Sequence, residues 1–186
     1  KTPNRFWETS ADQVPHHLVA YWMFGHYFHL PVPDLDHTDF LLILGGNPMV
    51  SNGSIMTAPD FSKRMRAISK RGQVVVIDPR RSETADKADQ HHFIRPATDV
   101  LLLLAMLNEI YVQGYAKKAR VNNRAADLAP EIERMADFAK GYSAESVAPI
   151  TGIAADEIKR LVKEFCEAES SVCYSRMGVS VQEFGL

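Results

Sequence analysis

Residues suited to nucleotide binding follow four apolar runs of the sequence. Glycine lets a ligand come close to the backbone, a carboxylate accepts hydrogen bonds from ribose hydroxyls or a base, and arginine pairs with phosphate. The residues concerned are Gly45, Gly46, Asn47, Asp78, Arg80, Thr98, Asp99, Gly178 and Gln182. Each group alone has a simpler explanation, so the elements that position them decide whether they form a site.

Gly45, Gly46 and Asn47 follow the apolar run Phe40–Leu44. They form either a ligand-binding loop or a plain turn after a strand, because short glycine-rich loops are weak signals. The sequence here is neither G-x-G-x-x-G nor a Walker A motif, so it does not support an NAD or ATP site.

Charged and hydroxyl groups follow the next two runs. Asp78 stands at a strand end, where nucleotide-binding α/β folds hold ribose hydroxyls, and Arg80 and Arg81 can pair with phosphate unless they are simply a solvated pair. Asp99 can accept hydrogen bonds from a guanine edge, although a helix cap at Thr98 or Asp99 is the common alternative.

Gly178 and Gln182 follow the last run, Val172–Ser175. Glycine again permits a close approach, and the glutamine amide can both donate and accept. One such strand end carries little information, whereas several at one edge of a sheet describe a nucleotide clamp.

The apolar runs predict a parallel sheet. Phe40–Leu44 and Val74–Ile77 are apolar without alternation, which is typical of strands buried on both faces. Shorter strands are expected at 92–94 and 172–175, and helices at 59–70, 100–113 and around 158–166. This alternation predicts an α/β fold, a three-layer Rossmann-like domain with a parallel sheet and a helical insert. Ligands of such folds lie beyond the carboxyl ends of the strands.

A single domain over residues 1–186 is expected from the length. Its parts are a leading helix within 1–30, core β/α units at 39–113, a helical insert at 114–150, and a final helix and strand at 151–186. The leading helix is expected to end at Pro31. The run Val100–Leu107 is apolar on nearly all sides, which predicts that the helix at 100–113 is the most buried element and makes Leu103 and Leu104 core positions.

The composition excludes several classes of protein. Of the 186 residues, 46% are hydrophobic and the net charge is −2, which argues against disorder and against a basic nucleic-acid-binding module. The longest strongly apolar run is too short to cross a bilayer. Neither an initiator Met nor a signal peptide is seen. We therefore expect a piece of a longer protein in the cytoplasm, with a periplasmic location still open.

Seven histidines raise the question of a metal site. The tightest groupings are His16-His17 and His26-x-x-His29. Zinc sites usually add cysteine or carboxylate ligands at defined spacing, and none converge here. The two cysteines are expected to be small buried hydrophobic residues. We expect neither a metal ligand nor a catalytic residue in this chain.

An ordered set of segments resembles a known family. The segments are Thr38–Pro48, Val76–Ala85 and Ile94–Asp99, followed by Thr151-Gly152-Ile153 and Arg176-Met177-Gly178. From about Pro31 onward the sequence resembles the molybdopterin oxidoreductases, which include formate dehydrogenases, nitrate reductases and dimethyl sulfoxide reductase. One departure is Ala97, where the family commonly has glycine.

The resemblance implies a cofactor of two molybdopterin guanine dinucleotides that hold molybdenum or tungsten. It implies that Gly45, Gly46 and Asn47 line the phosphate and pterin, and that Asp78 and Arg80 hold ribose and phosphate. It also implies that Thr98 and Asp99 meet the guanine and that Gly178 closes over the pterin near the metal. The family's iron–sulfur cluster and the protein ligand of the metal would lie outside this chain.

Three functions compete at this point. The leading one is an internal piece of the catalytic subunit of a molybdenum or tungsten oxidoreductase, formate-dehydrogenase-like or nitrate-reductase-like, and inactive alone. Its partners would be the remaining domains of the same polypeptide and electron-transfer subunits, with no nucleic acid and no direct membrane insertion. The alternatives are a stand-alone nucleotide-binding or regulatory module, such as the central domain of a thiamine-diphosphate enzyme, and a pure interaction domain.

Overall fold

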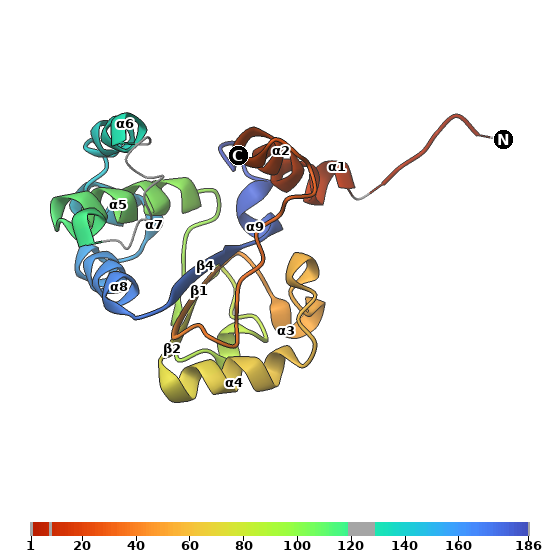
Figure 1. The fold of residues 1–186 in the computed structure, drawn as a ribbon, viewed down its shortest axis with the longest axis horizontal. Helices are drawn as coiled ribbons and strands as arrows, with labels where there is room; N and C mark the ends of the chain where they lie inside the picture. Colours follow the sequence, from red (N-terminus) through yellow and green to blue (C-terminus); the bar gives the residue numbers. More distant parts are fainter. Residues whose placement is uncertain (1, 8, 119–128, 186) are drawn as a thin grey trace. The chain divides into compact units, whose positions relative to one another are not determined.

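The computed structural model of the chain describes residues 2–7, 9–118 and 129–185 (Figure 1). Its helices are α1 (Thr9–Asp12), α2 (Val14–Phe24), α3 (Pro48–Ser51), α4 (Phe61–Arg71), α5 (Asp99–Val112), α6 (Ala129–Ala139), α7 (Ala144–Thr151), α8 (Ala155–Glu167) and α9 (Met177–Ser180). Its strands are β1 (Phe40–Leu44), β2 (Gln73–Ile77), β3 (Gln90–His92) and β4 (Ser171–Ser175). Short 3₁₀ turns lie at Ser54–Met56, Ala85–Lys87 and Tyr115–Lys118.

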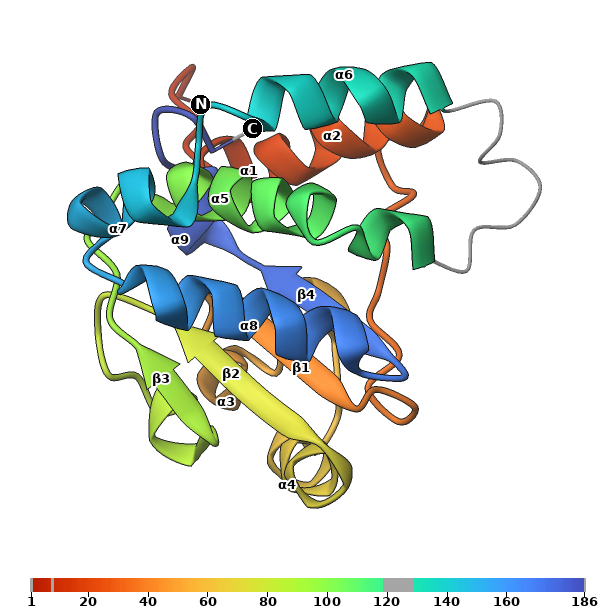
Figure 2. The ribbon, with the colours of Figure 1, turned by 90° about the vertical axis from the view of Figure 1, so that its left-hand side faces the viewer.

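The strands form one parallel sheet in the order β3–β2–β1–β4 (Figure 2). β1 lies between two partners and is buried at all five residues, which explains why it contains only apolar side chains. Leu44 pairs with Ile77 on one side and with Ser175 on the other, so three strands end at one edge. The predicted α/β class with a parallel sheet is confirmed, and the short strand lies at Gln90–His92 rather than at 92–94.

The chain divides into two compact units, and each is described by itself. The first consists of Lys1–His92 and Ser170–Leu186 and contains the whole sheet. The second is Phe93–Glu169 and contains α5 to α8, with no strand among its described residues. The helical segment is therefore longer than the predicted insert at 114–150. The expectation of a single domain stays a prediction.

In the first unit, α4 covers one face of the sheet (Figure 1). Alternate residues of the strands share this face because side chains alternate along a strand. The buried cluster includes Leu41 and Ile43 of β1, Val74 and Val76 of β2, and Phe61, Met65 and Ile68 of α4. The three α4 residues recur at helical spacing, so the helix predicted at 59–70 and its inner face are confirmed.

In the second unit, α5 contacts α6, α7 and α8. Leu102 and Ala105 are fully buried, whereas Leu103 and Leu104 are only half-buried and Val112 is exposed. The prediction that this helix is the most buried element is wrong, because every residue of β1 is buried. The neighbouring helices cover one stripe of α5 rather than its whole circumference.

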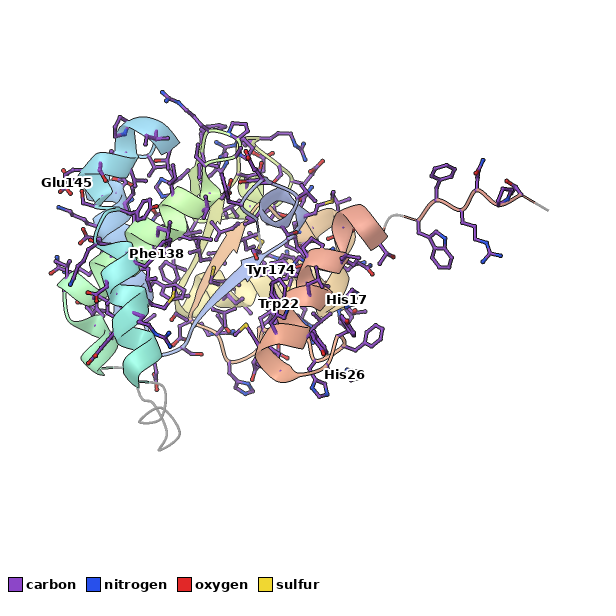
Figure 3. The ribbon with its side chains drawn as sticks, turned by 90° about the horizontal axis from the view of Figure 1, so that it is seen from above. His17, Trp22, His26, Phe138, Glu145 and Tyr174 are labelled. Atoms are coloured by element: carbon purple, nitrogen blue, oxygen red, sulfur yellow. The ribbon has the colours of Figure 1, made fainter. Side chains whose placement is uncertain are left out.

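The leading helix α2 ends earlier than predicted. Gly25 adopts a left-handed conformation with φ of 77°, and its N–H donates to the carbonyl oxygen of Tyr21 at 2.8 Å. A glycine C-cap therefore ends the helix before Pro31 is reached. Trp22 lies on α2 (Figure 3). It is exposed at 66%, and Phe28 after the helix is exposed at 75%. Among the described residues, none of the helices has both the length and the apolar character needed to cross a bilayer.

Candidate functional site

A pocket of about 260 Å³ opens in the first unit where β1, β2 and β4 end. It is lined by the predicted residues Gly45, Gly46, Asn47 and Asp78, together with Asp12, Val50, Ser51, Ser54, Arg176 and Met177. The topology accounts for this, because parallel strands deliver the residues after them to one edge. The structure thus brings these four predicted residues together, and their contact with a ligand stays a prediction.

The Asn47 side chain joins the loop after β1 to the loop after β2. Its Nδ2 donates to the Glu83 carboxylate at 2.7 Å, and its Oδ1 accepts from the N–H and the hydroxyl of Thr84 at 3.2 and 2.7 Å. Thr84 is fully buried, and its hydroxyl also accepts from the N–H of Met49 at 3.1 Å. The amide therefore holds the loops together, and a ligand would compete with these bonds for it.

Asp78 lines the pocket from the end of β2. Its Oδ1 accepts from the backbone N–H of Arg80 at 2.7 Å, and its own N–H donates to the carbonyl of His92 at 3.2 Å. Nε2 of His91 donates to the Asp78 carbonyl at 3.0 Å. Among the described residues, hydrogen bonds engage only one of the two carboxylate oxygens, so Oδ2 is the atom that can accept from a ligand hydroxyl.

Arg80 does not line the pocket. Its guanidinium lies 3.5 Å from the Glu83 carboxylate, and both side chains are exposed. The backbone N–H of Glu83, then the Asn47 amide and the charge of Arg80, hold the pKa of this carboxyl below its usual value. An exposed pair of this kind contributes little to stability. Arg80 can therefore exchange the Glu83 carboxylate for a phosphate at a small cost in free energy. Its binding of a ligand phosphate stays a prediction.

Gly178 and Gln182 stabilise the loop after β4. The N–H of Gly178 donates to the carbonyl of Gly45 at 3.1 Å, and Nε2 of Gln182 donates to the carbonyl of Gly178 at 2.5 Å. Neither residue lines the pocket, whereas Met177 between β4 and Gly178 does. The close approach that Gly178 permits in this structure is to Gly45, and its approach to a pterin stays a prediction.

Arg176 is a pocket residue that the sequence reasoning missed. It is only 6% exposed, and its Nη2 donates to Oδ1 of Asp12 at 2.7 Å. Its Nη1 is buried and lacks a hydrogen-bond partner among the described residues. The signal in the sequence was its position directly after an apolar strand, in the segment Arg176-Met177-Gly178. Its partner Asp12 could not be found in this way, because it lies 164 residues away.

His16 lies close enough to Arg176 to feel its charge. Burial, followed by the charge of Arg176, lowers the pKa of His16, against smaller opposing effects of the Ser175 backbone and Asp12. The imidazole is therefore neutral near pH 7. Arg176 is the basic residue among those that line the pocket.

Thr98 and Asp99 belong to the second unit. Thr98 is the N-cap residue of α5, but its hydroxyl donates back to the carbonyl of Arg95 at 2.7 Å and makes no cap hydrogen bond. Asp99 is 3% exposed in the first turn of α5. Ala97 before them has a positive φ of 66°, where glycine is the favoured residue. The meeting of this pair with a guanine stays a prediction.

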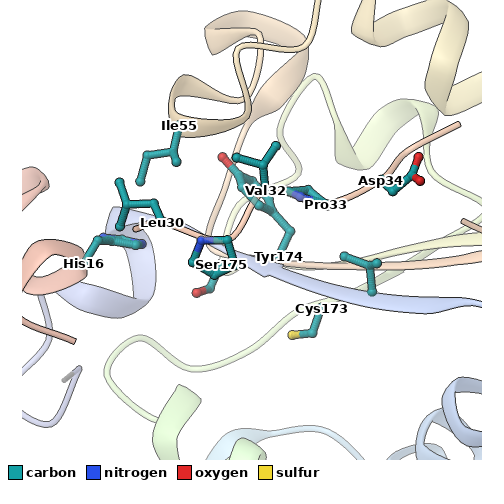
Figure 4. Close-up of a pocket in the computed structure, with 11 residues that line it drawn as sticks. His16, Leu30, Val32, Pro33, Asp34, Ile55, Cys173, Tyr174 and Ser175 are labelled. Carbon is teal, nitrogen blue, oxygen red and sulfur yellow. The ribbon is translucent and has the colours of Figure 1, made fainter. Parts of the chain in front are cut away.

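A larger pocket of about 460 Å³ in the first unit contains none of the predicted residues (Figure 4). Its walls come from the segment Leu30–Asp34, from Ile55, and from β4 with Cys173 and Tyr174. The Tyr174 hydroxyl donates to the carbonyl of Gly53, and burial raises the pKa of Tyr174 to about 12. The groups suited to nucleotide chemistry lie in the smaller pocket, which we take as the candidate site.

Comparison with known proteins decides the family. A family model described as molybdopterin oxidoreductase matches residues 4–163. The chain belongs to the molybdopterin oxidoreductase family. Among the residues 2–7, 9–118 and 129–185, this member of the family has no group of three or more His, Cys, Asp or Glu residues that could hold a metal ion.

Curated relatives support the same family. The chain is 31% identical over 149 residues to formate dehydrogenase H of Escherichia coli, covering 80% of this chain and 20% of that protein. It is 30% identical over 135 residues to a nitrate reductase of Symbiobacterium thermophilum, covering 70% of this chain and 18% of that protein. The molybdopterin oxidoreductase chain thus spans about a fifth of the length of these relatives.

A solved structure shows the same fold. Acetylene hydratase from Pelobacter acetylenicus superposes with a TM-score of 0.66 at 23% identity, covering 83% of this chain and 20% of that one. The resemblance inferred from the motifs is therefore confirmed at the level of family and fold. Family membership also favours the oxidoreductase hypothesis over the thiamine-diphosphate and pure-interaction alternatives.

Proposed function

We propose that the pocket after β1, β2 and β4 binds the nucleotide part of a molybdopterin guanine dinucleotide. The observation that carries the proposal is that Arg176 is one of the residues lining this pocket and that its buried Nη1 has no hydrogen-bond partner among the described residues. A buried charged donor without a partner is costly, and a phosphate oxygen would satisfy it. The pocket therefore fits an anionic ligand.

The glycine and the carboxylate of the pocket fit the rest of a nucleotide. Gly46 lines the pocket without a side chain, and a Cβ there would lie 3.4 Å from Cε1 of Tyr174 and 3.5 Å from Cβ and Cγ of Arg176. Asp78 has a carboxylate oxygen to offer to a ribose hydroxyl. We assign Gly46 to close approach, Asp78 to ribose and Arg176 to phosphate, with Arg80 as a second phosphate group from outside the lining. The pterin contact of Gly178 belongs to the same proposal. The guanine contacts of Thr98 and Asp99, in the second unit, are a separate proposal that follows from the family resemblance.

In the complete enzyme, the cofactor would supply a molybdenum or tungsten centre that exchanges two electrons with the substrate. The residues of this chain bind and orient the cofactor and shield its phosphates from water. We expect a second molybdopterin guanine dinucleotide, an iron–sulfur cluster, the metal's protein ligand and electron-transfer partners to be provided outside this chain. Formate or nitrate is the expected substrate, by analogy with the relatives, and the chain alone is expected to be inactive.

Cofactor loading of the complete polypeptide tests this proposal. We expect Asp78→Ala and Asp99→Ala to lower bound molybdenum and the guanine nucleotide released on denaturation. Loss of a charge-assisted hydrogen bond corresponds to roughly ten- to a hundredfold in affinity. Asp36→Ala is the matched control, because Asp36 pairs with Arg64 and does not line the pocket. Full loading in both variants, with an unchanged unfolding midpoint, would overturn the proposal.

A further inference from the structure

Arg176 combines burial, a fixed partner and a free donor in one side chain. Its side chain is 7% exposed, Nη2 is held by Asp12, and Nη1 has no partner among the described residues. We propose that Arg176 is the specificity residue that requires an anionic group on the ligand, and that Asp12 holds the guanidinium ready while weakening anion binding by its own charge. This inference rests on the proposed function and extends it to a residue pair that the motifs do not include.

The chemistry of arginine limits what the free donor can bind. Guanidinium stays charged at all relevant pH values and offers donors only, so its complement is an oxygen acceptor, best an anionic one. The pocket also contains the carboxylates of Asp12 and Asp78. One carboxylate is already bonded to Nη2 and the other belongs to the β2 loop, so neither satisfies Nη1.

Asp12 has two effects that a single substitution can separate. Its Oδ1 accepts from Nη2 and so fixes the orientation of the guanidinium. Its negative charge also repels a phosphate bound at Nη1, because the two anions would share one guanidinium. Asparagine retains the accepting oxygen and removes the charge. Asp12→Asn is therefore expected to strengthen anion binding, whereas a purely structural ion pair predicts no change in binding.

The experiment uses the complete polypeptide prepared without cofactor, titrated with inorganic pyrophosphate, GDP and guanosine in a calorimeter at low salt. We expect Arg176→Gln to weaken pyrophosphate and GDP binding by about ten- to a hundredfold, as for the loss of a charge-assisted hydrogen bond. Arg176→Lys should retain part of the affinity, and guanosine binding should not depend on residue 176. Asp12→Asn should tighten pyrophosphate binding several-fold, and added salt should reduce this gain.

Matched controls come from another arginine–aspartate pair. Arg64 and Asp36 form an ion pair in the same unit and do not line the pocket, so Arg64→Gln and Asp36→Asn should leave binding unchanged. Circular dichroism and the unfolding midpoint verify that each variant is folded. If Arg176→Gln does not fold, the Arg176→Lys variant tests the role of residue 176 in its place.

The outcomes separate this inference from the proposed function. If GDP binds and depends on Asp78, but the folded Arg176 variants bind pyrophosphate as tightly as the wild type, the inference and the assignment of Arg176 to phosphate are wrong, whereas nucleotide binding through Asp78 stands. Unchanged or weaker binding in Asp12→Asn would refute the part assigned to Asp12. If the cofactor-free protein binds neither GDP nor pyrophosphate, both proposals fail.

Discussion

The backbone of Gly178 lies directly against that of Gly45, and the N–H of the first donates to the carbonyl oxygen of the second. A Cβ at Gly178 would lie 2.6 Å from that oxygen, and a Cβ at Gly45 would lie 2.9 Å from Cα of Gly178. Both glycines are thus required by the contact between the loops after β1 and β4, whatever ligand the pocket binds.

Gly178→Ala should therefore destabilise the protein. Overpacking against a backbone typically costs about 1–3 kcal/mol, which urea unfolding can measure. Gly141→Ala is the control, because a Cβ there meets nothing within 4 Å and should change stability little. Equal stability of the two variants would show that the loop after β4 adapts without cost.

Asn47 and Thr84 should be energetically coupled. Asn47→Ala removes the acceptor of a fully buried hydroxyl, which should cost about 1–3 kcal/mol in the free energy of unfolding. Thr84→Val removes the hydroxyl itself. The double variant should lose less than the sum of the two single losses, and strict additivity in this cycle would contradict the contact.

Ala97→Gly should stabilise the protein. Ala97 has a φ of 66°, a conformation that costs a non-glycine residue on the order of 1 kcal/mol, part of which is offset by the greater freedom of glycine in the unfolded chain. The expected gain is a few tenths to about 1 kcal/mol. Ala88 has an ordinary φ of −73°, so the control variant Ala88→Gly should instead be less stable than the wild type. A loss of stability in both variants would show that the backbone at Ala97 is not strained.

Leu102→Ala should be more destabilising than Leu104→Ala. Leu102 is fully buried in the second unit, so Leu102→Ala should lower the free energy of unfolding by about 2–5 kcal/mol. Leu104 is only half-buried, so Leu104→Ala should lower it less. Chemical denaturation of both variants measures the difference. An equal loss at both positions would restore the sequence-based expectation of a helix enclosed on all sides.

His16 should make stability depend on pH in the mildly acidic range. Its pKa in the folded state lies below the ordinary value for histidine, chiefly because of burial and then because of the charge of Arg176. As the pH falls from about 6.5, the unfolded chain therefore takes up a proton before the folded one does, and stability declines until the folded-state pKa is passed. His16→Gln should make the unfolding midpoint depend less on pH between about pH 7 and pH 5, and an unchanged pH dependence in this variant would contradict the role assigned to His16.

The sequence predicted well what depends on local patterns. β1 and β2 were found because each is a continuous apolar run, and α4 because Phe61, Met65 and Ile68 recur at helical spacing. The end of α2 was misplaced because Pro31 was taken as the terminating residue, whereas Gly25 ends the helix in the structure. A glycine C-cap six residues before the proline was therefore the signal that the prediction missed.

The candidate site was only partly predictable for a different reason. The use of the Asn47 amide depends on Thr84, 37 residues later, and the environment of Arg176 depends on Asp12, 164 residues earlier. No periodicity or spacing rule links residues at such separations. Pattern reasoning could therefore propose which strand ends meet, but not which side chains there are already bonded to each other.

The order of the strands also constrains when the pocket can form during synthesis. β1 pairs with β4, whose residues follow it by about 130 positions, so the ribosome must release Ser171–Ser175 before this edge of β1 is covered. Until then β1 exposes unpaired backbone groups on a fully apolar strand, a template for pairing with other chains. Arg176 leaves the ribosome directly after β4, so anion binding would become available in the same step that protects the nascent chain from aggregation.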